Sequence, residues 1–301
     1  MATLVLAFLA GCVDSSTPPK PDIATERRPV VSAVSYPLAF FAEFVGGEAI
    51  EVHYPIPPGQ DPSTWMPDTE SILKFQQSDR ILLNGGSLVP WVEQVSLPES
   101  KLIRTTDEIE SSLIPIATAV THRHGPEGDD VEPEMASTTW LDLSMAGQQA
   151  ARVRDSLIEL LPEHEQAFER RFLDLKAALD GLDRRLMEVS DPESDRPFFV
   201  AEPVYQYLAR RYAMNVVTLD WDAASVPDES AWARLAEVRK SHPADVMLWP
   251  SEPDPEVSRR LRELGISVVV FDPVAAEPVS GQFLSIMERN VDRLIDALDS
   301  D

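Results

Sequence analysis

A long helical stretch, residues 144–188, divides the chain and constrains its fold more than any other feature. Apolar residues recur within it at steps of four and three: Phe168, Phe172, Leu175, Leu179, Leu182 and Leu186. This spacing puts all of them on one face of a helix. Pro162 predicts a break into two helices, because proline disrupts a helix interior. We expect the stretch to act as a stiff strut that connects two units.

Strands and helices alternate on both sides of this stretch. Runs rich in Val and Ile, bounded by Gly, Pro or Asn, predict strands at 29–35, 50–56, 80–84, 101–105, 197–201, 215–220, 245–249 and 266–271. Helices are expected at 38–46, 69–78, 88–95, 203–212, 230–241, 254–264 and 280–298. Such alternation favours parallel sheets. The predicted fold is α/β with two lobes, each a roughly four-stranded parallel sheet flanked by helices, and a ligand cleft between them.

The N-terminal residues indicate export and lipid attachment. A short apolar run, ATLVLAFLAG, ends immediately before Cys12, and a polar, Pro-rich segment follows. This pattern is typical of a bacterial lipoprotein signal, although no Lys or Arg precedes Cys12. The alternative is an ordinary apolar N-terminus with a buried cysteine. The predicted organisation is listed along the chain as a signal (1–11), a lipidated Cys12 with its tether (12–28), an N-terminal lobe (29–143), connecting helices (144–188) and a C-terminal lobe (189–301).

Composition excludes some partners and some kinds of site. The chain has 51 Asp and Glu against 26 Lys and Arg, a formal net charge of −25. A protein this acidic repels nucleic acid, so we expect no nucleic-acid partner. Cys12 is its one cysteine, so neither an intramolecular disulfide nor a zinc site built from cysteines can form.

Polar residues that follow strands are the first candidates for a binding site, because ligands of open parallel sheets lie beyond the carboxyl ends of the strands. They are the loop 59–68, Glu202, Glu252 and Asp272. Glu202 and Asp272 belong to the same lobe and can converge. Two carboxylates in a cleft repel each other without a cation or a proton, which indicates a bound cation. A cationic or polar organic ligand, or structural roles at a helix start and a turn, are the alternatives.

Six segments resemble motifs of a known family. They are listed in chain order: SAVSYPLAFFAEFVGGE (32–48), PGQDPSTWMP (58–67), NGGSLVPW (84–91), TTWLDL (138–143), FVAEPVYQY (199–207) and FLSIMERNVDRL (283–294). From Pro29 to Leu298 the chain resembles the metal-binding, cluster A-I solute-binding proteins of ABC importers, which are zinc and manganese receptors. Each motif alone is weak, but their order and their places on the predicted elements are specific.

The resemblance implies four metal ligands between the lobes, which fall on Ser63, Thr138, Glu202 and Asp272 of this sequence. The family has histidine where Ser63 and Thr138 stand here. At the position of Glu202, zinc receptors have His and many manganese receptors have Glu. Zinc favours imidazole and thiolate ligands. Two carboxylates with two hydroxyls suit a harder ion, such as manganese, magnesium or calcium.

The remaining histidines offer a second, weaker hypothesis. Residues 122–137 are polar and without periodicity, which predicts a mobile surface loop, and they contain His122 and His124. These two histidines could form an auxiliary metal collector, as zinc receptors of this family often have a longer His-rich loop here, or the loop is simply polar. His164 and His242, on predicted helices, are expected to face solvent.

We therefore expect a monomeric, lipid-anchored receptor, periplasmic or on the cell surface, that binds zinc or manganese and delivers the ion to an ABC permease. One alternative is a diverged relative with a lost or altered ligand that acts as an adhesion or scaffold lipoprotein. An enzyme that uses Glu202 and Asp272 as an acid/base pair is a third possibility. The sequence shows neither a nucleophile–base constellation nor a glycine-rich phosphate loop, so no enzyme is expected.

Overall fold

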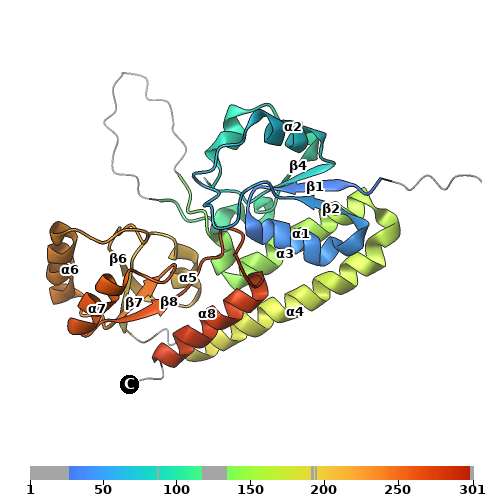
Figure 1. Ribbon diagram of the computed structural model, residues 1–301. Coiled ribbons are helices and arrows are strands. Elements are labelled where there is room, and N and C mark those ends of the chain that lie inside the picture. The colour runs from blue at the N-terminus through green and yellow to red at the C-terminus, as the bar shows by residue number, and fades with distance from the viewer. Residues whose placement is uncertain (1–26, 87, 117–133, 191–192, 194, 299–301) are drawn as a thin grey trace, which may run out of the picture.

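Two lobes lie side by side in the computed structural model of the chain (Figure 1). The structure describes residues 27–86, 88–116, 134–190, 193 and 195–298. Each lobe is built on a four-stranded parallel sheet, with the strand orders β2-β1-β3-β4 and β6-β5-β7-β8. Both sheets therefore share one topology, and the predicted fold class is confirmed.

The N-terminal lobe carries the first sheet. Its strands and α-helices are β1 (Val30–Ala33), α1 (Tyr36–Gly46), β2 (Glu51–His53), α2 (Thr69–Gln77), β3 (Arg80–Leu83) and β4 (Leu102–Arg104). Short 3-10 helices connect them at Gly47–Ala49, Pro90–Gln94, Glu99–Lys101, Asp107–Ser112 and Thr139–Leu141. The helix expected at 88–95 is thus only a short 3-10 turn, which Pro90 begins.

The C-terminal lobe repeats the pattern of strand and helix. Its elements are β5 (Pro197–Val200), α5 (Gln206–Arg211), β6 (Asn215–Thr218), α6 (Glu229–Ser241), β7 (Val246–Trp249), α7 (Pro255–Glu263), β8 (Ser267–Val270) and α8 (Phe283–Leu298). All strands in the described part of both lobes lie within the predicted ranges. Aspartate side chains begin two of the helices: Asp228 accepts from Ala231 N, and Asp254 accepts from Glu256 N.

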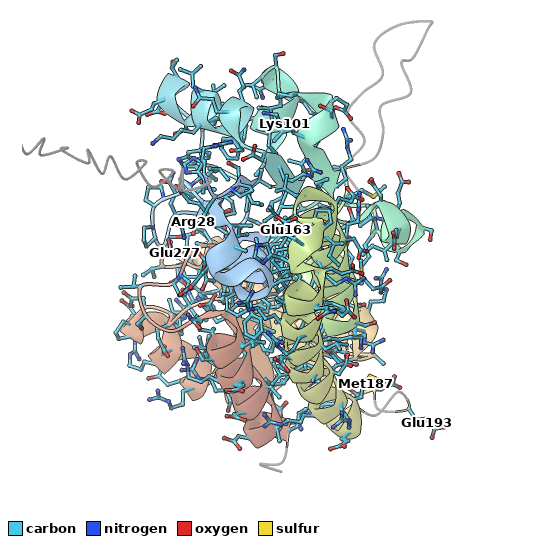
Figure 2. All side chains as sticks on the ribbon, turned by 90° about the vertical axis from the view of Figure 1, so that its right-hand side faces the viewer. Arg28, Lys101, Glu163, Met187, Glu193 and Glu277 are labelled. Atoms are coloured by element: carbon cyan, nitrogen blue, oxygen red, sulfur yellow. The ribbon has the colours of Figure 1, made fainter. Side chains whose placement is uncertain are left out.

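The connecting stretch forms two helices, α3 (Leu143–Leu160) and α4 (Glu165–Val189), separated by the 3-10 turn Pro162–His164. The break at Pro162 is confirmed. Figure 2 labels Glu163 and Met187 near the two ends of α4, which packs against α1, α3 and α8. Every member of the predicted apolar stripe on α4 is at most 5% exposed. One continuous core contains this stripe together with residues of both sheets, so α4 holds the two lobes together.

The two histidines expected to face solvent differ. His164 is exposed, as predicted. The prediction for His242 is wrong: it is only 9% exposed, its Nε2 lies 3.0 Å from the carbonyl oxygen of Phe198, and its ring lies against Phe199. His242 follows the last residue of α6, and its ring packs on β5. This contact depends on tertiary packing, which a position at a helix end does not indicate. In the described part of the chain, no helix is long and apolar enough to cross a membrane.

Candidate functional site

Segments that follow strands of one lobe meet the other lobe at a junction. Trp140 Nε1 donates to the carbonyl of Pro273 at 2.6 Å, and Gly59 N–H donates to the carbonyl of Glu277 at 2.9 Å. Figure 2 shows Glu277 beside the N-terminal lobe, on the loop that leads into α8. Gly59 has a φ of +80°, a conformation that suits glycine. The loop after β8 therefore crosses to the N-terminal lobe and contacts the loop that carries Ser63.

Glu202 follows β5 and is partly buried. Its Oε1 accepts from the backbone N–H of Ala223 at 2.8 Å, which connects the segments that follow β5 and β6. The sequence suggested a helix start for this residue, and that interpretation is wrong, because α5 begins only at Gln206. One carboxylate oxygen is therefore fixed by the protein, while Oε2 has no hydrogen-bond partner in the described part of the chain.

Asp272 follows β8 and forms the turn that its sequence suggested. Its Oδ1 accepts from Val274 N–H at 2.7 Å, and Val274 has a φ of +56°. Burial raises the pKa of Asp272, while the N–H of Val274 and the cations Arg289 and Arg293 lower it in part. Oδ2 has no hydrogen-bond partner among the described residues. The side chain is thus a partly desolvated carboxylate with one oxygen left for a ligand.

The buried ring of Tyr205 relates the two carboxylates to each other. Tyr205 is 1% exposed, and its hydroxyl donates to the carbonyl of Phe271 at 2.7 Å, immediately before Asp272. Burial raises the pKa of Tyr205 most, and the charges of Glu202 and Asp272 raise it further. The charges of both carboxylates thus act on one buried phenol, and the hydroxyl of Tyr205 contacts the residue before Asp272.

Thr138 brings the N-terminal lobe to this region. It is 4% exposed, and its Oγ1 donates to the carbonyl of Val204 at 2.6 Å, two residues beyond Glu202. The backbone next to Thr138 is also fixed, because Asn84 Nδ2 donates to the carbonyl of Ser137 at 2.7 Å. The hydroxyl of Thr138 still has lone pairs available, since its hydrogen bond uses only the proton.

Ser63 lies apart from the other three candidates. It is exposed, and its backbone N–H donates to Asp61 Oδ1 at 2.8 Å, which stabilises the loop. No described contact joins the Ser63 hydroxyl to Thr138, Glu202 or Asp272. Hydrogen bonds thus connect the segments that carry Thr138, Glu202 and Asp272, and the bond between Gly59 and Glu277 connects the loop of Ser63 to the segment after Asp272.

The candidate residues Thr138, Glu202 and Asp272 offer only oxygen atoms as ligands. Within the described ranges, no group of three or more His, Cys, Asp and Glu side chains is arranged to hold a metal ion. The oxygen atoms of two carboxylates and of the Thr138 hydroxyl are of the kind that suits a hard divalent cation. His122, His124 and Cys12 lie outside the described residues.

Sequence reasoning missed one residue that bears directly on this site. Asn290, on α8, is fully buried and bonds to both backbone groups of Asp272. It lies within the segment FLSIMERNVDRL, so the resemblance already marked its neighbourhood. The pairing with Asp272 spans 18 residues and depends on how α8 packs, which sequence spacing does not give.

Comparisons with known proteins find a family match over most of the chain. The profile of a family described as "ZnuA: Zinc-uptake complex component A periplasmic" matches residues 31–297. The chain is 23% identical over 316 residues to "Zinc-binding lipoprotein AdcA" of Streptococcus pneumoniae, in an alignment that covers 100% of this chain and 60% of AdcA. It is 21% identical over 316 residues to "Manganese ABC transporter substrate-binding lipoprotein PsaA" of Streptococcus anginosus, in an alignment that covers 99% of this chain and 98% of PsaA. The chain thus spans less than two thirds of AdcA.

A solved structure shows the same fold. The Zn(II)-bound ZnuA-like domain of Streptococcus pneumoniae AdcA matches with a TM-score of 0.76 and 20% identity, covering 91% of this chain and 99% of that domain. AdcA and PsaA are named for binding zinc and for manganese transport, respectively. These matches favour a metal receptor over the adhesion or scaffold alternative.

Proposed function

Because the chain belongs to the ZnuA family of zinc-uptake components, we propose that it is an extracytoplasmic solute-binding protein that carries a divalent cation to an ABC permease. The cation is zinc or manganese, the two ions for which its relatives are named. The family consists of substrate-binding transport proteins, so the proposal includes no catalytic step.

One observation carries this proposal: Glu202 and Asp272 follow two strands of the same sheet, and each has one carboxylate oxygen fixed by a backbone N–H and one without a hydrogen-bond partner among the described residues. The first oxygen of each carboxylate is fixed by a backbone N–H, so the free oxygens are held in place before any ion arrives. A cation held by both carboxylates would balance their negative charges. The proposed ligands are therefore Glu202, Asp272 and Thr138, with Ser63 contributing through movement of its loop or through water.

The donor set favours manganese over zinc. No histidine lies at the four ligand positions, and oxygen ligands suit harder ions. Zinc remains a candidate because Irving–Williams order gives it the higher affinity for most sites of a given type. His122 and His124 provide a possible second point of contact for zinc, outside the described residues.

We further propose that the mature protein begins at Cys12, carries lipid there and acts as a monomer at the outer face of a membrane. The segment 12–28 serves as tether, and the lobes 29–143 and 189–301 are connected by 144–188. The apolar run before Cys12 and the lipoprotein names of AdcA and PsaA support this anchor. Fractionation of cells that produce a Cys12→Ala variant tests this anchor. We expect the variant to lose its association with the membrane.

Metal titration of single variants tests the ligand assignment. We expect Glu202→Ala and Asp272→Ala each to abolish most binding of manganese and zinc, and Ser63→Ala to weaken it less. Glu237→Ala is the matched control, since this glutamate on α6 is 74% exposed and pairs with Lys240 rather than with a cation that acts on Asp272. Its affinity should equal that of the wild type.

Two results would contradict the assignment. Binding that survives both carboxylate changes would show that the site lies elsewhere. If such binding disappears when His122 and His124 are changed to alanine, the site belongs to that loop instead.

A further inference from the structure

The backbone of Asp272, the candidate metal ligand, lies just beyond the sheet and has no partner among the strands that the structure describes. β8 is an edge strand that ends at Val270, and the last backbone bond to β7 comes from Phe271 N–H to the carbonyl of Trp249 at 2.9 Å. Beyond it, Asp272 needs a partner for both its N–H and its carbonyl, because unpaired buried backbone groups are costly.

Asn290 supplies both partners from α8. Its Oδ1 accepts from Asp272 N–H at 3.1 Å, and its Nδ2 donates to the carbonyl of Asp272 at 2.7 Å. Asn290 is 0% exposed, and its Nδ2 also lies 3.6 Å from the sulfur of Met287. The side-chain amide of Asn290 thus makes the two backbone hydrogen bonds that a neighbouring strand would otherwise make to Asp272. These bonds fix the position and orientation of the Asp272 backbone.

The side chain of Asp272 follows from this backbone position. With its backbone held, Oδ1 accepts from Val274 N–H in the turn, and Oδ2 is left over. Tyr205 holds the preceding residue through the carbonyl of Phe271. Resting on the proposed function, we propose that Asn290 is a positioning residue for the cation site, which orients Asp272 toward the ion without touching the ion.

The positioning role of Asn290 predicts a measurable loss of Mn²⁺ affinity when the residue is changed. Groups that orient metal ligands from the second layer typically change affinity by about 10- to 100-fold when they are removed. Asn290→Ala leaves the N–H and carbonyl of Asp272 unpaired, so the turn relaxes and Oδ2 moves. We expect the dissociation constant for Mn²⁺ to rise by about 10-fold or more.

A double-mutant cycle separates positioning from a general effect on the fold. Mn²⁺ is titrated into the full chain as wild type, Asn290→Ala, Asp272→Ala and the double variant, and into Val291→Ala as control. Val291 is also fully buried on α8 but has no described contact with Asp272. If Asn290 acts through Asp272, the residual Mn²⁺ binding that Asp272→Ala retains, titrated at raised Mn²⁺ concentration, should not weaken further when Asn290 is also alanine. Val291→Ala should lower the melting temperature and leave the affinity unchanged.

Each outcome distinguishes this inference from the proposed function. If the wild type binds neither Mn²⁺ nor Zn²⁺, the proposed function fails and the inference fails with it. If the wild type binds and Asp272→Ala weakens binding while Asn290→Ala does not, only the inference is overturned. Equal effects of Asn290→Ala with and without the Asp272 carboxylate would overturn it too.

A second variant covers the case in which Asn290→Ala does not fold. Asn290→Asp has the same size and keeps an oxygen for Asp272 N–H, but it loses the N–H donor to the carbonyl of Asp272. We expect the same loss of affinity from this variant, with the same dependence on Asp272. Wild-type affinity in folded Asn290→Asp would contradict the positioning role.

Discussion

Replacing Thr138 by valine separates two roles that the structure combines in one hydroxyl. Valine keeps the shape of the side chain, which is 4% exposed, and removes the donor to the carbonyl of Val204 at 2.6 Å. Losing a neutral hydrogen bond and leaving a buried acceptor unpaired costs about 1–3 kcal/mol. The entropy of unfolding scales with chain length, so for a protein of this size the melting temperature should fall by about 2–5 °C.

The same change should also affect the ion. If the hydroxyl of Thr138 is a ligand, the valine variant binds Mn²⁺ more weakly, by about 10-fold. Thermal unfolding followed by circular dichroism and calorimetric titration measure the two effects separately. Ser156→Ala is the matched control, because its buried hydroxyl also donates to a carbonyl, that of Val153 at 2.7 Å, but on α3 away from the junction.

The two measurements refute different parts of the reasoning. An unchanged melting temperature for Thr138→Val would show that the bond to Val204 contributes nothing to the junction. A lower melting temperature with unchanged affinity would show that Thr138 connects the lobes and is not a ligand. The Ser156→Ala control should show the loss of stability alone.

Further substitutions test the core and the electrostatics. Asp272→Asn should stabilise the metal-free protein at neutral pH, because burial raises the pKa of Asp272 and its ionised form therefore costs stability in the folded state. That gain should vanish below the ordinary pKa of 3.8, where the carboxyl is protonated in both states, and a pH series of melting temperatures checks it. In the wild type, Mn²⁺ affinity should fall with decreasing pH through this raised pKa, since protons compete with the ion; pH-independent affinity would argue against Asp272. Leu179→Ala should cost about 2–5 kcal/mol in chemical denaturation, because Leu179 is fully buried in the shared core. Its affinity for Mn²⁺ should be unchanged, and a changed affinity would mean that α4 influences the site directly.

The fold was largely predictable because its signals are local. Short runs of Val, Ile, Leu and Phe mark most of the strands, and the apolar stripe on α4 has the helical period from Phe168 to Leu186. Pro162 breaks the helix wherever the chain goes, so its effect needs no tertiary information. The helix expected at 88–95 was wrong. The segment contains apolar residues, but it forms only the short 3-10 helix Pro90–Gln94.

The resemblance supplied candidate members of the site, but it did not supply their hydrogen-bond partners. The resemblance pointed to Thr138, Glu202 and Asp272, whose segments are connected by the hydrogen bonds from Thr138 to Val204 and from Tyr205 to Phe271. It could not show that Glu202 accepts from Ala223, which lies 21 residues away on another loop. Nor could it show the bond from Asn290 to Asp272, since that contact depends on how α8 packs beside β8. Partners of this kind are set by tertiary packing and leave no periodic trace in the sequence.

Calorimetric titration of the metal-free wild-type chain with Mn²⁺, and then with Zn²⁺, tests the central claim most directly. The account predicts saturable binding of one ion per chain with a dissociation constant below about 100 μM, equivalent to about −5.5 kcal/mol or stronger. The oxygen-rich donor set predicts that Mn²⁺ binding persists when His122 and His124 are changed to alanine. No binding of either ion below that concentration would contradict the account of this protein as a metal receptor.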